Sequence, residues 1–405
     1  MDSSSAAAES SRPAWLGVLF SIVLLGFVLG VAEVAARVAY RLRDQVRAAR
    51  GWLPPKAPFQ LHGYEVLDPE VPGLWRLRPG TNLTLAEAMD MNRELGRSVG
   101  LQNLIDAAAV LGITENETIF RVNASGYKGP ELDPAHSKTR ILAVGDSCTF
   151  GTMFDDYTYS RSLERELAQS GLQVEVINAG VGGYSPAHSL ARMDEFQALG
   201  AEIALVYHGW NALFSERGLF PRWQGRSRLL RAWAAAWRTL MVDPRMLAQR
   251  ELDRPLRPDA NAPEIELADA YTPSFLPDVR RIVSELSDGG TRVVVVTLPA
   301  LFTSDEEPSA QALEVGHMPP YTDNPFTFAH LAERYNELLR DLARDEGLML
   351  IDLDRWSREA LHPRASFFTD SVHLTPLGQE MIGVHMAGEL ESLLRELQKD
   401  RSEGG

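Results

Sequence analysis

Five short apolar runs constrain the fold more than any other feature of this sequence. They are rich in Val and Ile, most of them end in Gly, Asp, Asn or Pro, and they occupy residues 140–146, 173–180, 202–209, 292–299 and 348–353. Helix-compatible stretches such as SRSLERELAQSG and PDVRRIVSELSDGG lie between them. Continuous apolar strands that alternate with amphipathic helices are typical of a parallel sheet covered on both faces. We therefore predict an α/β fold with a doubly wound parallel sheet of about five strands.

Polar residues close the predicted strands, at the edge of the sheet where ligands bind in folds of this kind. Asp146 and Ser147 follow the first strand, the segment NAGVGGYS (178–185) follows the second, and Asn211 follows the third. Near the C-terminus, Asp370 precedes His373 by three residues. Since the carboxyl ends of parallel strands share one edge, we expect these segments to assemble into one site.

The residue types in this set suit acyl transfer. A serine hydroxyl needs an adjacent base to become nucleophilic, histidine is the natural base near neutral pH, and a carboxylate can hold the imidazole in the required tautomer. Each residue also has a structural interpretation. Ser147 could cap the helix that follows it, His373 could be a cap or a buried polar residue, and Asn211 could form a turn.

The ordered set of segments resembles the GDSL-type, or SGNH, hydrolase family over roughly residues 138–395. The matching blocks are GDSCTFG, NAGVGGYS, GWNALF and DSVHLTPLG. This resemblance implies the flavodoxin-like SGNH fold, with Ser147 as nucleophile, His373 as base and Asp370 as the partner of that base.

The same resemblance implies an oxyanion hole made by the backbone N–H groups of Ser147 and Gly183 and by the side chain of Asn211. The asparagine block departs from the family pattern Gly-x-Asn-Asp, because Ala212 follows Asn211. Trp210 could line a pocket for the acyl or sugar group, or pack beneath it. Cys148 is the single cysteine and fits a small buried filler better than a second nucleophile.

Three functions are compatible with this site. The first is a serine esterase or deacylase that hydrolyses an acylated carbohydrate or a lipid ester. The second is an O-acyltransferase that uses the same triad to modify a glycan, and the third is a non-catalytic scaffold of the same fold. We expect no cofactor and no metal, because the sequence lacks a His-Glu-x-x-His motif and paired cysteines. The net charge of −15 argues against a nucleic-acid partner, and the sequence does not indicate an oligomeric state.

The N-terminal segment predicts a single-pass membrane protein. Residues 1–13 are expected to form a disordered tail and residues 14–36 a transmembrane helix, because 19 consecutive residues from Ala14 carry no charge. A cleaved signal peptide is the competing interpretation. Five arginines follow the span and argue for a cytoplasmic hydrolase domain. The segment RVNASGYKGPEL resembles membrane-tethered bacterial members of the family, and this slightly favours an extracytoplasmic domain.

The remaining boundaries follow from composition. Residues 37–137, rich in Pro and Gly, are expected to form a linker and a small accessory region. Residues 138–396 form the predicted hydrolase domain, and 397–405 a disordered tail. An Arg- and Trp-rich insertion occupies about 213–265, and between 215 and 258 it holds ten Arg against four acidic residues. Its segment RLLRAWAAAWRTL predicts a basic amphipathic helix, which could pack on the sheet, cover the site or lie on an anionic membrane.

Overall fold

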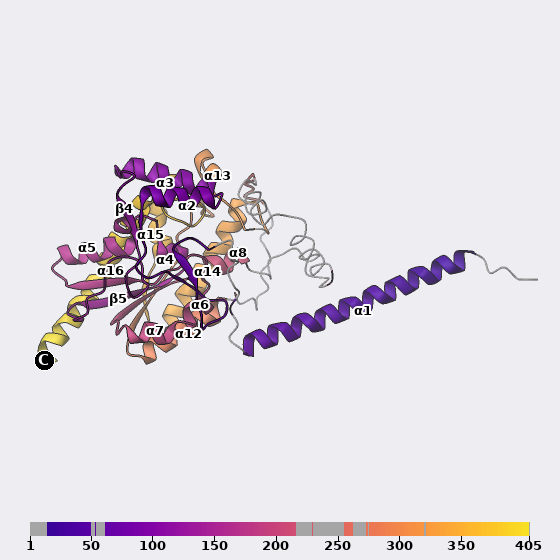
Figure 1. Cartoon of the computed structure of the whole chain (residues 1–405), viewed down its shortest axis with the longest axis horizontal. Coiled ribbons are helices and arrows are strands. Elements are labelled where there is room, and N and C mark those ends of the chain that lie inside the picture. Colours follow the sequence, from indigo (N-terminus) through magenta and orange to yellow (C-terminus); the bar gives the residue numbers. More distant parts are fainter. Residues whose placement is uncertain are drawn as a thin grey trace, which may run out of the picture. The chain divides into compact units, whose positions relative to one another are not determined.

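All five predicted strands are present and form one parallel sheet. The fold comes from a computed structural model that describes residues 14–49, 53, 61–215, 229, 255–261, 273, 275–319 and 321–404. The strand order is β6-β5-β7-β8-β9, with bounds β5 Thr139–Gly145, β6 Val174–Asn178, β7 Ile203–Tyr207, β8 Arg292–Val296 and β9 Met349–Ile351 (Figure 1). Every residue of β5, β6 and β7 is buried. Because β5 lies between β6 and β7, the winding direction reverses there, which opens a crevice at the carboxyl ends of these strands.

Helices cover both faces of the sheet, as the alternating sequence pattern predicts (Figure 1). Helix α5 (Tyr159–Gln169) packs against α16 (Pro376–Gly404). Helix α12 (Leu276–Asp288) packs with α6 (Pro186–Leu190) and α7 (Met193–Ala198) and contacts β7 and β8. Helix α14 (Pro325–Asp345) contacts β8 and β9. Shorter elements are α4 (Ser147–Phe150), η2 (Asp155–Tyr157), α8 (Trp210–Ser215), α13 (Ala310–Val315), α15 (Leu353–Ala360) and η4 (Arg364–Ser366).

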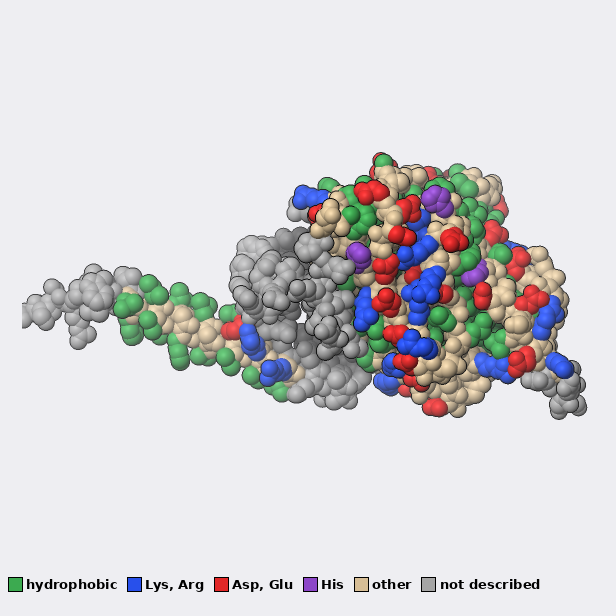
Figure 2. All heavy atoms as spheres, turned by 180° about the vertical axis from the view of Figure 1, so that it is seen from behind, with side chains coloured by type: hydrophobic (Ala, Val, Ile, Leu, Met, Phe, Trp, Pro, Cys, Tyr) green, Lys and Arg blue, Asp and Glu red, His purple; other side chains and the backbone are tan. Residues whose placement is uncertain are grey.

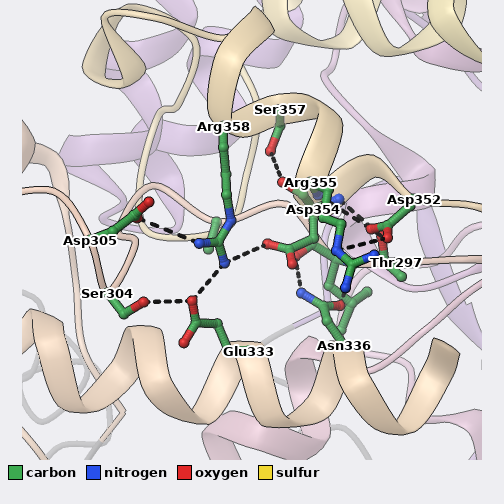
Figure 3. A network of polar contacts seen from close by, with 12 residues as sticks. Thr297, Ser304, Asp305, Glu333, Asn336, Asp352, Asp354, Arg355, Ser357 and Arg358 are labelled. Atoms are coloured by element: carbon green, nitrogen blue, oxygen red, sulfur yellow. Dashed lines mark hydrogen bonds and ion pairs between the residues drawn. The ribbon is translucent and has the colours of Figure 1, made fainter. Parts of the chain in front are cut away.

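A network of ion pairs joins α14 to α15 beyond the ends of β8 and β9. The guanidinium of Arg340 donates to Asp352 Oδ2 at 2.8 Å and to Asp354 Oδ2 at 2.6 Å. Arg358 of α15 reaches across to Glu333 of α14 at 2.8 Å (Figure 3). Each cation has acidic partners within reach, which offsets the cost of its partial burial. This network fixes α15 against α14.

The accessory region belongs to the same compact unit as the hydrolase fold, a unit formed by Leu53–Leu219 and Arg245–Gly405. It consists of two antiparallel strand pairs, β1 (Glu65–Leu67) with β2 (Trp75–Leu77) and β3 (Asn82–Thr84) with β4 (Thr118–Arg121), and of helices α2 (Leu85–Glu94) and α3 (Ser98–Leu111). These elements form a second apolar core, and Phe150, Phe154, Val181 and Tyr184 of the hydrolase fold are part of it. The accessory region is therefore packed onto the segments that follow β5 and β6.

The N-terminal helix α1 (Ala14–Ala49) extends beyond the residues predicted for the membrane span. Its stretch Leu19–Ala39 is long and apolar enough to cross a membrane, and a signal sequence near an N-terminus can meet the same criteria of length and hydropathy. Large apolar side chains are exposed along it, and the spheres of α1 in Figure 2 are mostly hydrophobic until charged residues begin near its C-terminal end.

One sequence expectation differs from the structure, and another concerns residues that the structure does not describe. Helix α16 runs to Gly404 and so includes residues 397–404 of the stretch 397–405 that we expected to form a disordered tail. The predicted amphipathic helix within 215–258 lies outside the described residues for almost all of its length.

Candidate active site

Ser147 stands at the first turn of the short helix α4, which follows the interior strand β5. The carboxylate of Asp146 caps this helix by accepting a hydrogen bond from the N–H of Cys148 at 2.9 Å. The turn requires glycine before the aspartate, because a Cβ on Gly145 would lie 1.9 Å from Thr149 Oγ1 and 2.5 Å from the carbonyl oxygen of Tyr207. The sharp strand-to-helix turn therefore exposes Ser147 at the carboxyl edge of the sheet.

His373 and Asp370 meet Ser147 from the opposite end of the chain. The Nε2 atom of His373 lies 2.7 Å from Ser147 Oγ, and its Nδ1 atom lies 2.6 Å from Asp370 Oδ2. The other oxygen of Asp370 accepts hydrogen bonds from the N–H groups of Val372 and His373, at 2.9 and 2.8 Å. A short loop that pairs Phe368 with Leu374 precedes α16 and holds both residues in place. The three side chains form one continuous line of contacts, as proton transfer between them requires.

The charges of this group favour a protonatable imidazole next to an ionised carboxylate. Burial alone would lower the pKa of His373, but the charge and the hydrogen bond of Asp370 outweigh it and raise that pKa above its ordinary value of 6.5. Burial alone would likewise raise the pKa of Asp370, yet His373 and the backbone hydrogen bonds hold it well below its usual range. Such a pair can accept a proton from Ser147 and stabilise the imidazolium that results.

The glycine segment after β6 lies beside Ser147 and is held from two sides. Gly183 has a φ of +81°, in the left-handed region that suits glycine. The indole N–H of Trp75, in the accessory strand β2, donates to the carbonyl oxygen of Gly182 at 3.1 Å. Asn178 donates to the carbonyl oxygen of Thr149 at 2.9 Å and accepts from the N–H of Gly180 at 3.0 Å. Asn178 thus ties the glycine segment to the helix that carries Ser147, a role that the sequence reasoning missed.

Asn211 lies at the start of α8, directly after the strand β7 and its two-residue exit. Its amide Nδ2 donates to the carbonyl oxygen of Tyr184 at 3.0 Å. Tyr184 is adjacent to Gly183, so this bond links the two predicted oxyanion donors. Ala212, which stands where the family pattern has aspartate, is buried among apolar residues. The orientation of Asn211 is therefore supported by the backbone of the glycine segment.

Two other residues that the sequence singled out lie in the core. Trp210 is 2% exposed, stacks on Phe328 with ring centres 5.8 Å apart, and is not among the residues that line the cavity at Ser147. We considered that Trp210 could line the pocket or pack beneath it, and the structure shows that it packs in the core. Cys148 is also 2% exposed, and burial raises the pKa of its thiol well above the usual value. A neutral buried thiol is a filler and not a nucleophile.

A second histidine, which the sequence reasoning missed, faces the carboxylate of the site. His317 Nδ1 lies 3.9 Å from Asp370 Oδ2, and its ring is 5.0 Å from that of Phe214. Burial lowers the pKa of His317, so the ring beside Asp370 is neutral near pH 7. No spacing or motif marks His317 in the sequence, because it reaches Asp370 through a loop between α13 and α14.

Serine, histidine and aspartate joined in this order at the carboxyl edge of an α/β sheet define the class of serine hydrolases that act by acyl transfer. The sequence profile of the GDSL-like Lipase/Acylhydrolase family matches residues 143–381, which is more than half of the chain. The chain belongs to this family and is a serine ester hydrolase.

Solved structures similar to this chain include two acetylxylan esterases and a lipase/acylhydrolase, all of low sequence identity. The acetyl xylan esterase AlAXEase is 17% identical and aligns over 63% of this chain and 98% of its own, with a TM-score of 0.38. An acetylxylan esterase from Geobacillus stearothermophilus is 14% identical over 62% of this chain and 94% of its own, with a TM-score of 0.39. A lipase/acylhydrolase from Enterococcus faecalis is 17% identical over 63% and 96%, with a TM-score of 0.38. The comparison with curated proteins gave no match.

Proposed function

We propose that this protein hydrolyses an acyl ester through a covalent acyl-enzyme on Ser147, with His373 as general base and Asp370 as its partner. The single observation that supports this assignment best is the pair of contacts from Ser147 Oγ to His373 Nε2 (2.7 Å) and from His373 Nδ1 to Asp370 Oδ2 (2.6 Å). The raised pKa of His373 supports its role as a base that holds the proton after the attack.

The reaction proceeds in two similar halves. His373 Nε2 accepts the proton of Ser147 as the oxygen attacks the ester carbonyl carbon, and the carbonyl oxygen becomes an oxyanion. When the C–O bond to the alcohol breaks, His373 returns the proton to the departing alcohol. Water then attacks the acyl-enzyme with His373 again as the base, which releases the acid and restores Ser147.

The oxyanion is stabilised by the N–H groups of Ser147 and Gly183 and by the amide of Asn211. The hydrogen bond from Asn211 to the carbonyl oxygen of Tyr184 supports this assignment, because it fixes the amide beside the glycine segment. Donors that are held in place before the reaction cost no reorganisation when the charge develops.

The proposed substrate is the ester of an acylated carbohydrate or of a lipid. We further propose that α1 anchors the protein in a membrane and that the hydrolase domain lies on the extracytoplasmic side. The 21-residue stretch from Leu19 to Ala39, which is apolar apart from Ser21, Glu33 and Arg37, supports the anchor, because about 20 residues of helix cross a bilayer.

A fluorophosphonate probe tests the proposed nucleophile, because it reacts covalently with an activated serine. We expect the full chain to be labelled, Ser147→Ala to lose the label, and the exposed Ser125→Ala to keep it. Hydrolysis of p-nitrophenyl acetate should follow the same pattern. Labelling or hydrolysis that persists in Ser147→Ala would contradict the assignment.

A further inference from the structure

A cavity of about 340 Å³ opens at Ser147 and His373, and the accessory region forms one of its walls. That wall includes Met91 and Asn92 of α2, Arg97 from the turn between the two helices, and Asn103, Leu104 and Ala107 of α3. The facing wall is the segment that follows Ser147, from Phe150 to Phe154. The accessory helices lie outside the residues 143–381 that match the family. This wall is therefore a feature of this chain and not of the shared hydrolase fold.

Most of the surface exposed inside the cavity is apolar, and apolar side chains contribute to it from both walls. Met91, Leu104 and Ala107 face the cavity from the accessory helices, and Phe150, Met153 and Phe154 face it from the hydrolase fold. All six belong to the second apolar core or pack directly against it. Their positions are thus fixed by close packing, so the cavity is formed before a substrate arrives.

Arg97, His62 and Asn92, three of the polar residues in the lining, have hydrogen-bond partners within the protein. Arg97 donates from Nη1 to Nε2 of His62, and the Nδ1 atom of His62 contacts the buried carboxylate of Glu65 at 3.0 Å. Asn92 donates to the carbonyl oxygen of Ala88 at 2.9 Å. No carboxylate side chain lines this cavity in the described part of the chain. The space next to Ser147 is therefore suited to a group that makes few hydrogen bonds.

We propose that this cavity, bounded by α2, α3 and the Phe150–Phe154 segment, is a subsite for a hydrocarbon group of at least four carbons in the ester substrate. The proposal rests on the proposed function and narrows its substrate class. The enzyme acts on esters with a longer apolar chain and prefers them to acetyl esters of small polar alcohols. The cavity volume lies near the lower end of the roughly 300–1,000 Å³ found for small-molecule pockets. This volume suits a single hydrocarbon chain of a few carbons.

The size of the expected effect follows from the burial of methylene groups. Burying one CH₂ is worth about 0.8 kcal/mol, or roughly fourfold in kcat/KM when the group is bound in the transition state. A butyryl group has two more methylenes than an acetyl group, so we expect a preference of about fifteenfold. Each rate is divided by the hydroxide-catalysed rate of the same ester, so that intrinsic reactivity cancels.

The experiment measures kcat/KM of the full-length protein in detergent with two series of esters. One series varies the acyl group from acetyl to hexanoyl on p-nitrophenol. The other keeps the acetyl group and varies the alcohol from methyl to hexyl. An increase along the first series assigns the subsite to the acyl half of the ester, and an increase along the second assigns it to the alcohol half. If neither series shows an increase, the proposal is overturned.

Filling the cavity provides the structural control. Ala107→Phe places a ring into the cavity from α3, and Ala109→Phe places the same ring on the exposed face of that helix. We expect the chain-length preference to fall about tenfold in Ala107→Phe and to persist in Ala109→Phe. Met153→Trp fills the cavity from the other wall and replaces Ala107→Phe as the test if Ala107→Phe does not fold. An unchanged preference in a folded filling variant would contradict the subsite.

These outcomes separate the subsite from the proposed function itself. If Ser147→Ala retains hydrolysis of p-nitrophenyl acetate, the nucleophile is wrong and the function fails. If Ser147→Ala is inactive while chain length has no effect in either series, the function stands and only the subsite is rejected.

Discussion

The ammonium group of Lys128 lies 3.1 Å from the carbonyl oxygen of Phe150, the last residue of the helix that begins at Ser147. It also contacts the carbonyl oxygen of Thr152, and it lies 4.0 Å from the centre of the Phe150 ring. The carboxylate of Asp155 is 3.8 Å away, and both side chains are buried. Lys128 comes shortly after the accessory strand β4. A buried cation thus fixes the segment after Ser147, which also forms one wall of the cavity.

Replacing Lys128 with Met should destabilise the protein by about 3 kcal/mol or more, because breaking a buried ion pair leaves an uncompensated charge. Urea unfolding of the full chain measures this loss. Lys138→Met is the matched control, since Lys138 is half-exposed, and its effect should stay within about 0.5 kcal/mol. The double variant Lys128→Met/Asp155→Asn should regain part of the stability. Equal stability of Lys128→Met and Lys138→Met would show that the buried pair has no stabilising role.

Asn211→Ala should lower kcat by about a hundredfold or more and leave KM nearly unchanged, because an oxyanion donor acts mainly in the transition state. Steady-state kinetics with p-nitrophenyl acetate measures both constants. The exposed Asn82→Ala provides a control with the same change of side chain. A decrease in kcat of only a few-fold would mean that Asn211 orients Tyr184 and the glycine segment without binding the oxyanion.

The sheet and the position of Ser147 could be predicted from sequence because both depend on local patterns. Apolar runs mark buried parallel strands, and the residue that ends such a run lies at the carboxyl edge. Asn211 follows from the same rule. Asp370 and His373 do not follow a strand directly; they lie in the loop between η4 and α16. Their assignment depended on the resemblance to the family, since the spacing alone also occurs at Asp133 and His136.

The wall of the cavity could not be predicted, because it is made by tertiary contacts. Helix α3 reaches the site only because its Leu104 packs in one core with Phe150 and Phe154, which are distant in sequence. Lys128 and His317 also act across long sequence separations and carry no motif. Trp210 shows that closeness in sequence to a site residue does not place a side chain in the site. It precedes Asn211, but its indole ring packs in the core against Phe328.

The pH dependence of hydrolysis should follow the protonation of His373. The base must be neutral, so kcat/KM rises with pH through the pKa of His373, and Asp370 places that pKa above 6.5. The charge of Asp146 also raises the pKa of His373, whereas burial lowers the pKa of His317 on the other side of Asp370. Asp370→Asn should therefore move the acid limb to lower pH and reduce kcat by about 10⁴-fold.

The measurement is kcat/KM from about pH 4 to 9, which brackets the range in which a histidine titrates. The exposed Asp156→Asn should leave the acid limb where it is, since Asp156 is not among the residues that line the cavity at Ser147 and His373. An acid limb that does not move in Asp370→Asn would assign it to a group other than His373.

The side of the membrane can be read from one engineered cysteine, because the native Cys148 is 2% exposed and burial raises the pKa of its thiol. Ser125 is exposed in the accessory region, so Ser125→Cys offers the one accessible thiol in the described part of the chain. If the hydrolase domain is extracytoplasmic, a membrane-impermeant maleimide should label this variant in spheroplasts, which are cells with an intact cytoplasmic membrane and no outer barrier. The unmodified chain should remain unlabelled. Labelling that requires permeabilised cells would place the domain in the cytoplasm, as the arginines Arg37, Arg41, Arg43, Arg47 and Arg50 after the span predict.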